Sequence, residues 1–147
     1  MKVLLVEDVE GKANSIVSCI KEAFPDCEVV TRSSYHSAAK EIFLHHGDYQ
    51  LILLDMSMST YDKNIEELGG VPEAMAGKRI LEGMFLREIE TKVVVVTMYD
   101  RFGGEKLNEL DKEFQKEYAD FYRGYVFFSF NKADWQRVLI NKIKLMV

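Results

Sequence analysis

Three short stretches of this chain are continuously apolar, and they restrict its fold more than any other feature. They read VLLV at residues 3–6, LILL at residues 51–54 and VVVV at residues 93–96. A strand with one face in water alternates polar and apolar residues, whereas an unbroken apolar run suits a strand that is covered on both faces. The three runs therefore predict inner strands of a parallel sheet.

Apolar runs alternate with segments of helical spacing along the whole chain. Ala13, Ile16 and Ile20 illustrate that spacing in the first such segment, and Asn131 is the expected N-cap of the last. Strand–helix order repeated five times implies right-handed crossovers and helices on both faces of the sheet. We predict an α/β domain over residues 1–147, with strands at 2–6, 27–31, 51–54, 92–97 and 125–128.

Composition narrows the class of protein further. The 147 residues are 48% hydrophobic and 29% charged, which suits one folded domain. The net charge of −5 argues against a broad nucleic-acid surface. No apolar run approaches the length of a membrane span, and two cysteines do not make a disulfide framework. We therefore expect a cytoplasmic protein with no nucleic-acid or membrane partner.

Polar side chains gather where three of the predicted strands end. Glu7 and Asp8 follow the first strand, Asp55 follows the third, and Thr97 ends the fourth. The carboxyl ends of parallel strands meet at one edge of a sheet, which is where α/β proteins bind ligands. Converging carboxylates repel each other, and Mg²⁺ relieves that repulsion with one or two carboxylates, a carbonyl and waters. A carboxylate beside Mg²⁺ can also attack phosphorus.

The same residues make the chain resemble the receiver domains of two-component signalling. The matching text is VLLVED at 3–8, LILLDMSM at 51–58, VVVVT at 93–97 and GYVFF at 124–128. The resemblance spans nearly the whole chain. It implies a flavodoxin-like, doubly wound five-stranded parallel sheet of order 2-1-3-4-5 with five helices.

The resemblance also implies roles for individual residues. Asp55 matches the phosphoacceptor, and Asp8 matches the main metal-binding acid, with Glu7 as its neighbour. Ser57 matches the position whose backbone carbonyl reaches the metal. Thr97 matches the hydroxyl that binds the phosphoryl group. Beyond the residues expected to bind the metal and the phosphoryl group, Tyr125 matches the aromatic switch residue. In the family this residue turns inward when the hydroxyl at the position of Thr97 moves.

Two positions depart from the family pattern. The family carries a Lys three residues after the switch aromatic, usually followed by Pro, and this chain has Phe128 and Ser129 there. That Lys pairs with the phosphoryl group in the family, and a Phe cannot do so. Lys132 is the next lysine along the chain. Met98 stands after Thr97, where the family prefers a small residue.

Two regions are longer than the resemblance implies. The segment 57–76 after the third strand has no readable function. The fourth helix is expected to extend along a stripe of Phe114, Tyr118, Phe121 and Tyr122. Core packing is the favoured interpretation of this stripe, and a partner surface is the alternative.

The leading hypothesis is a stand-alone response-regulator receiver rather than an enzyme. It accepts a phosphoryl group at Asp55 with Mg²⁺, from a sensor histidine kinase or a phosphotransfer protein, and signals through contact with a downstream protein. The rival is a pseudo-receiver, an interaction scaffold without phosphorylation, motivated by Phe128 and Met98. A haloacid-dehalogenase-like phosphatase is disfavoured because no DxD motif follows either strand. Oligomeric state is left open, a homodimer included.

Overall fold

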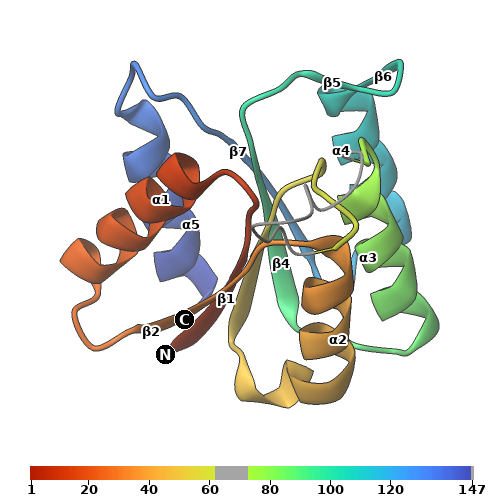
Figure 1. The fold of residues 1–147 in the computed structure, drawn as a ribbon, viewed down its shortest axis with the longest axis horizontal. Helices are drawn as coiled ribbons and strands as arrows, with labels where there is room; N and C mark the ends of the chain where they lie inside the picture. Colours follow the sequence, from red (N-terminus) through yellow and green to blue (C-terminus); the bar gives the residue numbers. More distant parts are fainter. Residues whose placement is uncertain (62–72, 147) are drawn as a thin grey trace.

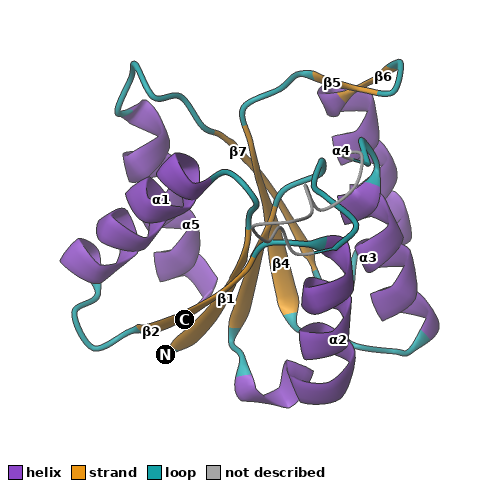
Figure 2. Cartoon of the chain, in the orientation of Figure 1, coloured by secondary structure: helices purple, strands orange, loops and turns teal. Residues whose placement is uncertain are grey.

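The computed structural model describes residues 1–61 and 73–146 as a parallel sheet between two layers of helices (Figure 1; Figure 2). The five-stranded sheet has the order β2-β1-β3-β4-β7, which is the predicted order because β5 and β6 form a separate hairpin. The strands are β1 (Lys2–Val6), β2 (Glu28–Arg32), β3 (Leu51–Leu54), β4 (Lys92–Thr97), β5 (Arg101–Phe102), β6 (Glu105–Lys106) and β7 (Tyr122–Phe127). The helices are α1 (Glu10–Ala23), α2 (Tyr35–His45), η1 (His46–Asp48), α3 (Ala76–Leu86), α4 (Leu107–Glu117) and α5 (Asp134–Met146).

The continuous apolar runs fill two separate cores, one on each face of the sheet. Along β1, Val3 and Leu5 face a core with α1 and α5, whereas Leu4 and Val6 face a core with α2, α3 and α4. Figure 1 shows α1 and α5 together on one side of the sheet and the other three helices on the opposite side. Successive side chains of a strand point to opposite faces, so a strand covered twice must be apolar at every position.

The last strand of the sheet begins earlier than predicted. β7 starts at Tyr122 rather than at residue 125, and its pairing with β4 shifts register between Val93 and Val95. Gly124 has a φ of 93° at this irregularity, a conformation that glycine adopts without steric cost. The bulge interrupts the pattern from which the strand was predicted.

A short hairpin between β4 and α4 was not predicted. β5 and β6 pair antiparallel through Gly103 and Gly104, whose φ angles are 55° and 89°. Two consecutive residues with positive φ make the tight turn that joins hairpin strands. The hairpin lies in the connection between β4 and α4.

The aromatic stripe of the fourth helix is core, as favoured. Phe114, Tyr118, Phe121 and Tyr122 are all buried, and their rings contact one another. The expected extension of the helix is wrong: α4 ends at Glu117, so only Phe114 lies in it, Tyr118 is its C-cap, Phe121 lies in the connection and Tyr122 begins β7.

The predicted start of the last helix is wrong. α5 begins at Asp134, so Asn131 lies in the preceding loop and is not its N-cap.

The long segment 57–76 falls partly outside the described residues. Within them, Met58 pairs with Glu73 in an isolated antiparallel bridge. No helix in the described part of the chain is long and apolar enough to cross a membrane.

Candidate functional site

Two buried acids meet at the carboxyl edge of the sheet. β1 and β3 are neighbours in register, with Val6 opposite Leu54, so the next residues, Glu7 and Asp55, lie side by side. Their exposed fractions are only 2% and 4%. The sequence predicted this convergence correctly, because it follows from the sheet order.

A lysine from α1 lies between these two carboxylates. The Lys12 ammonium is 2.5 Å from Glu7 Oε1 and 2.8 Å from Asp55 Oδ2. It also donates to the carbonyl oxygen of Val96 at 2.8 Å, and its side chain is fully buried. The ammonium thus has one acceptor next to each of the strands β1, β3 and β4.

Sequence analysis missed Lys12, although a signal was present. Lys12 is four residues before Ile16, on the face of α1 that Ala13 and Ile16 bury. A lysine on the apolar face of the helix that follows an acidic strand end is expensive to bury unless it is paired. That position pointed to an acidic partner.

The charge balance of this pocket shifts the ionisation of Glu7. Its pKa is raised from 4.5 to about 8. Burial is the largest cause, and the Asp55 carboxylate adds to it, whereas the charge and hydrogen bond of Lys12 act in the opposite direction. The pocket consequently holds less negative charge near neutral pH than two full carboxylates would give it.

Asp8, the residue after Glu7, contacts the loop after β3. Its Oδ2 accepts a hydrogen bond from the Ser59 backbone N–H at 3.2 Å. The Ser59 hydroxyl is buried and has no hydrogen-bond partner in the described residues. Ser57, between Asp55 and Ser59, is half-buried.

The oxygens in this region suit a hard divalent cation. Within residues 1–61 and 73–146 there is no group of three metal-ligating side chains. Mg²⁺ needs fewer, because it keeps several waters and binds through one or two carboxylates. The set predicted from the resemblance is Asp8, Asp55 and the Ser57 carbonyl, and Asp8 is hydrogen-bonded to the loop that carries Ser57 and Ser59. The Ser59 hydroxyl on that loop is buried and has no partner within the described residues. These oxygen donors are of the kind that Mg²⁺ prefers, and the metal-site residues remain a prediction.

The two remaining predicted residues lie on β4 and β7. Thr97 is fully buried at the end of β4, and its hydroxyl accepts a hydrogen bond from the Tyr99 N–H at 3.3 Å. Tyr125 is half-buried on β7 opposite Val95, packed against the core beneath α4. Its role as a switch stays a prediction.

Phe128 is part of an aromatic cluster that lies beside the acidic pocket. Its ring is 1% exposed and lies 4.7 Å from the Trp135 ring and 4.9 Å from the Phe130 ring, centroid to centroid. Lys132 is exposed and lines a surface groove. The lysine that reaches Asp55 is therefore Lys12 and not Lys132.

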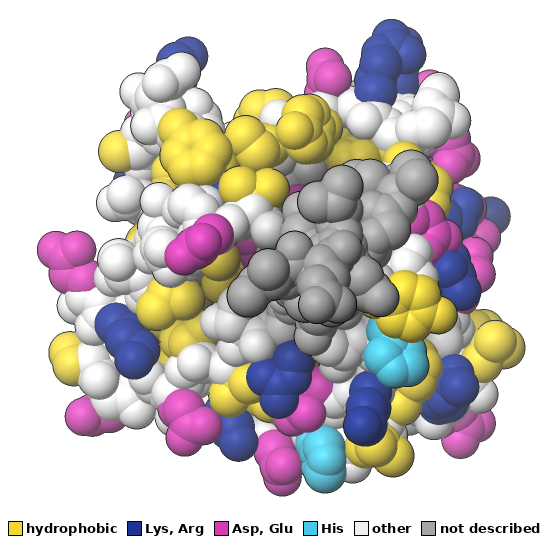
Figure 3. Space-filling model, in the orientation of Figure 1, with side chains coloured by type: hydrophobic (Ala, Val, Ile, Leu, Met, Phe, Trp, Pro, Cys, Tyr) yellow, Lys and Arg dark blue, Asp and Glu magenta, His cyan; other side chains and the backbone are white. Residues whose placement is uncertain are grey.

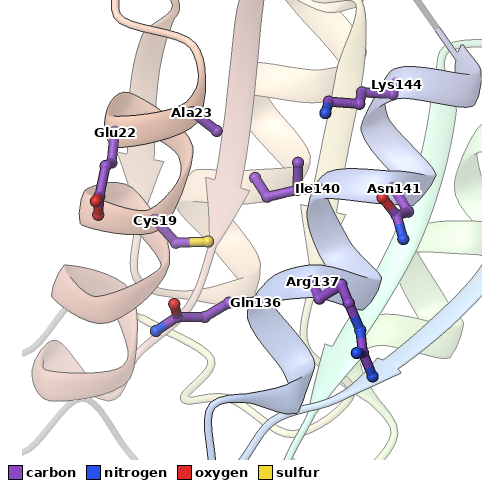
Figure 4. A pocket seen from close by; sticks show the side chains of 8 residues that line it. All are labelled: Cys19, Glu22, Ala23, Gln136, Arg137, Ile140, Asn141 and Lys144. Atoms are coloured by element: carbon purple, nitrogen blue, oxygen red, sulfur yellow. The ribbon is translucent and has the colours of Figure 1, made fainter.

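The surface carries two further features. Figure 3 shows apolar side chains along the upper edge of the molecule, near the carboxyl ends of the strands. We call the exposed apolar residues that end or follow β1, β4 and β7 the apolar rim: Val9, Tyr99, Phe127 and Phe130. A separate groove of about 400 Å³ runs between α1 and α5, where Cys19 faces Gln136 and Ile140 (Figure 4).

The sheet order and the acidic pocket at its carboxyl edge define the class, a flavodoxin-like α/β domain with a buried carboxylate cluster. Similar solved structures include the receiver domain of a LuxO repressor protein from Vibrio parahaemolyticus, at 18% identity and a TM-score of 0.63 over 99% of this chain and 88% of that one. A two-component response regulator from Clostridium difficile gives 15% identity and a TM-score of 0.64 over 99% and 94% of the two chains.

Curated relatives match at the sequence level along almost the full chain. The Detocs response regulatory protein DtcB of Enterobacter cloacae is 29% identical over 97% of this chain and 98% of its own length. The uncharacterized protein y4jR of Sinorhizobium fredii is 30% identical over 96% and 95%. No protein-family model matches. The chain therefore has the fold of response-regulator receiver domains and is similar over almost its full length to a response regulatory protein.

Proposed function

We propose that Asp55 accepts a phosphoryl group from the phosphohistidine of a sensor kinase or a phosphotransfer protein. The observation that carries this proposal is the setting of Asp55, a buried carboxylate at the end of β3 beside a single ammonium. The response regulatory protein among the relatives supports it. The chain then works as a cytoplasmic signalling module rather than as a metabolic enzyme.

The transfer requires a nucleophile that is oriented and partly neutralised. A carboxylate oxygen of Asp55 attacks phosphorus and forms a P–O bond, while the P–N bond to the donor imidazole breaks. The electron pair of that bond stays on the imidazole nitrogen, which takes a proton from solvent. The Met56 N–H holds Asp55 Oδ1 at 2.7 Å and so fixes the carboxylate plane. The Thr97 hydroxyl, which accepts from Tyr99, has its own hydrogen to donate to a phosphoryl oxygen.

Mg²⁺ is the cofactor we propose for this reaction. Asp8, Asp55 and the Ser57 carbonyl would hold it, with Glu7 as their neighbour. When bound, a divalent cation neutralises charge on the phosphoryl oxygens. The Mn²⁺-bound form of Rcp1, which is 17% identical with a TM-score of 0.60, has the same fold and supports the choice of a divalent metal.

The apolar rim supports a protein as the phosphoryl donor. Val9, Tyr99, Phe127 and Phe130 have exposed fractions of 42–56%, and they end or follow strands of the sheet that carries the acidic edge. Exposed apolar side chains that gather beside a polar site are typical of protein-binding surfaces. A downstream protein partner is the output we propose, with the added charge of about −1.5 to −2 as the signal.

Phosphorylation by a small donor tests the proposal. The protein is incubated with Mg²⁺ and acetyl phosphate, and intact mass is measured for the wild type and for Asp55→Asn. We expect the wild type to gain one phosphoryl group and Asp55→Asn to gain none.

Trp135, the single tryptophan, reports Mg²⁺ binding by fluorescence because it packs on Phe128 beside the pocket. An unmodified wild type would contradict the proposal.

A pseudo-receiver scaffold is the second candidate, and one observation favours it. Lys12 already neutralises Asp55 from within the protein, so the pocket is stable without a ligand. An unmodified wild type that still binds its partner would support this alternative.

A further inference from the structure

The Lys12 ammonium is the cation that meets Asp55 inside the protein. It contacts Asp55 Oδ2, Glu7 Oε1 and the Val96 carbonyl oxygen, and its side chain has no exposed surface. Within residues 1–61 and 73–146, no other basic side chain forms an ion pair with either acid. Its three acceptors lie in or directly after three neighbouring strands, β1, β3 and β4. The carboxyl edge of the sheet therefore fixes the position of the ammonium.

The place where a lysine of the loop after β7 would enter is filled by a phenyl ring. The Phe128 ring centroid is 5.9 Å from Lys12 Nζ, and the ring is enclosed by Phe130 and Trp135. The side chain of residue 128 therefore occupies space next to the Lys12 ammonium, and a lysine there would bring a second flexible cation toward the same acids.

We infer that Lys12 binds the phosphoryl group on Asp55, and that α1 thereby senses phosphorylation. This inference rests on the proposed function. A phosphoryl group brings about two negative charges into a pocket that is closed to solvent, and an ammonium already in contact with the acceptor is the nearest group to pair with them. Because Lys12 is in the first turn of α1, any movement of the ammonium is transmitted to that helix.

The packing of α1 would allow a movement of Lys12 to be transmitted to other parts of the protein. α1 shares its core with α5, and the groove between them separates part of the two helices (Figure 4). Gly11, just before Lys12, lies against the Phe130 ring of the apolar rim, at 3.7 Å from where a Cβ would be. A shift at Lys12 would therefore act on Phe130 of the rim and, through the shared core, on the packing of α1 against α5.

Rates of phosphorylation in matched variants test the role of Lys12. The variants are Lys12→Met, Lys12→Met with Phe128→Lys, and Lys21→Met as a control at an exposed lysine of the same helix. We expect Lys12→Met to lose about a hundredfold or more in the acetyl phosphate reaction, the effect of removing one charge-stabilising donor. Phe128→Lys should restore part of that rate, and Lys21→Met should match the wild type.

Each other outcome has a definite meaning. A wild-type rate in Lys12→Met overturns the inference and leaves the proposed function standing. A slow, folded Lys12→Met that Phe128→Lys does not improve also overturns it, since the ammonium would then serve the structure alone. If Lys12→Met does not fold, Lys12→Met with Glu7→Gln removes the unpaired acid and is read in the same way. An unmodified wild type overturns the proposed function itself.

Backbone amide chemical shifts test the coupling to α1. With beryllofluoride and Mg²⁺, we expect wild-type shifts to change most within residues 10–16 of α1 relative to the rest of the helices. In Lys12→Met with Phe128→Lys, the change should move to the loop after β7. Changes in that loop but not in α1 of the wild type would overturn the coupling.

Discussion

Removing the Lys12 ammonium leaves the buried acids Glu7 and Asp55 without a cation. We expect Lys12→Met to lower the free energy of unfolding by about 3–5 kcal/mol, because breaking a buried ion pair strands an uncompensated charge. Adding Glu7→Gln should recover part of that loss. Urea denaturation measures both. The exposed Lys21→Met is the control and should stay within about 0.5 kcal/mol of the wild type. A Lys12→Met protein as stable as the wild type would show that the pair is not stabilising.

A second residue pair controls stability in acid. The Tyr49 hydroxyl donates to Glu41 Oε1 at 2.7 Å, and this hydrogen bond is the largest cause that lowers the pKa of Glu41 below 4.5. A lowered folded-state pKa gives stability that is present above the unfolded value and is lost as pH falls through the folded value.

Tyr49→Phe should therefore raise the pKa of Glu41 and weaken the loss of stability below pH 4.5. At neutral pH it should cost about 1.5–3 kcal/mol, as for a hydrogen bond to a charged group. Carboxyl NMR titration of Glu41, with urea denaturation at several pH values, measures both effects. An unchanged Glu41 titration in Tyr49→Phe would refute this role of the hydroxyl.

At the scale of elements, the start of α3 is pressed against the end of β3. A Cβ on Gly77 would lie 2.6 Å from the Asp55 carbonyl oxygen and 2.9 Å from Met56 Cα, both backbone atoms. Gly77 N–H also donates to the Met56 carbonyl at 2.8 Å. The helix can approach the acceptor loop this closely because residue 77 has no side chain.

Gly77→Ala should push α3 away from the acceptor loop. We expect a loss of about 1–3 kcal/mol, as for an overpacked core, and slower phosphorylation at Asp55 because its backbone moves. Gly47→Ala is the matched control, since a Cβ there meets nothing within 4 Å. Thermal unfolding of the two variants measures the difference. Equal melting temperatures for the two variants would show that α3 can shift to accommodate the added methyl group without a loss of stability.

At the scale of the whole molecule, stability should follow the order of strands in the sheet. β1, β3 and β4 lie inside the sheet with buried residues almost throughout, whereas β2 is an edge strand with exposed and half-buried residues only. Amide hydrogens in well-covered inner strands exchange only through large openings of the fold.

Hydrogen–deuterium exchange should therefore be slowest in β1, β3 and β4 and clearly faster in β2. Peptide-level mass spectrometry over a time course measures this. Protection of β2 equal to that of β3 would mean that the edge opens only together with the core.

The sequence alone determined the fold and the convergence of the acids. The unbroken runs 3–6, 51–54 and 93–96 required strands covered on both faces, and strand–helix alternation then required a parallel sheet. In a parallel sheet the strand ends that carry Glu7 and Asp55 share one edge, which follows from local periodicity and chain order. The strand order implied by the family resemblance then puts the two acids side by side.

Only the tertiary structure decided which cation meets Asp55. Lys12 and Asp55 are 43 positions apart, and Lys12 and Val96 are 84 apart, so no spacing along the chain relates them. Their contact depends on how α1 packs over the sheet edge, which is set by the buried side chains of α1, α5 and the strands together. Side-chain periodicity predicts which face of a helix is buried, but not which buried atom lies beside a given carboxylate.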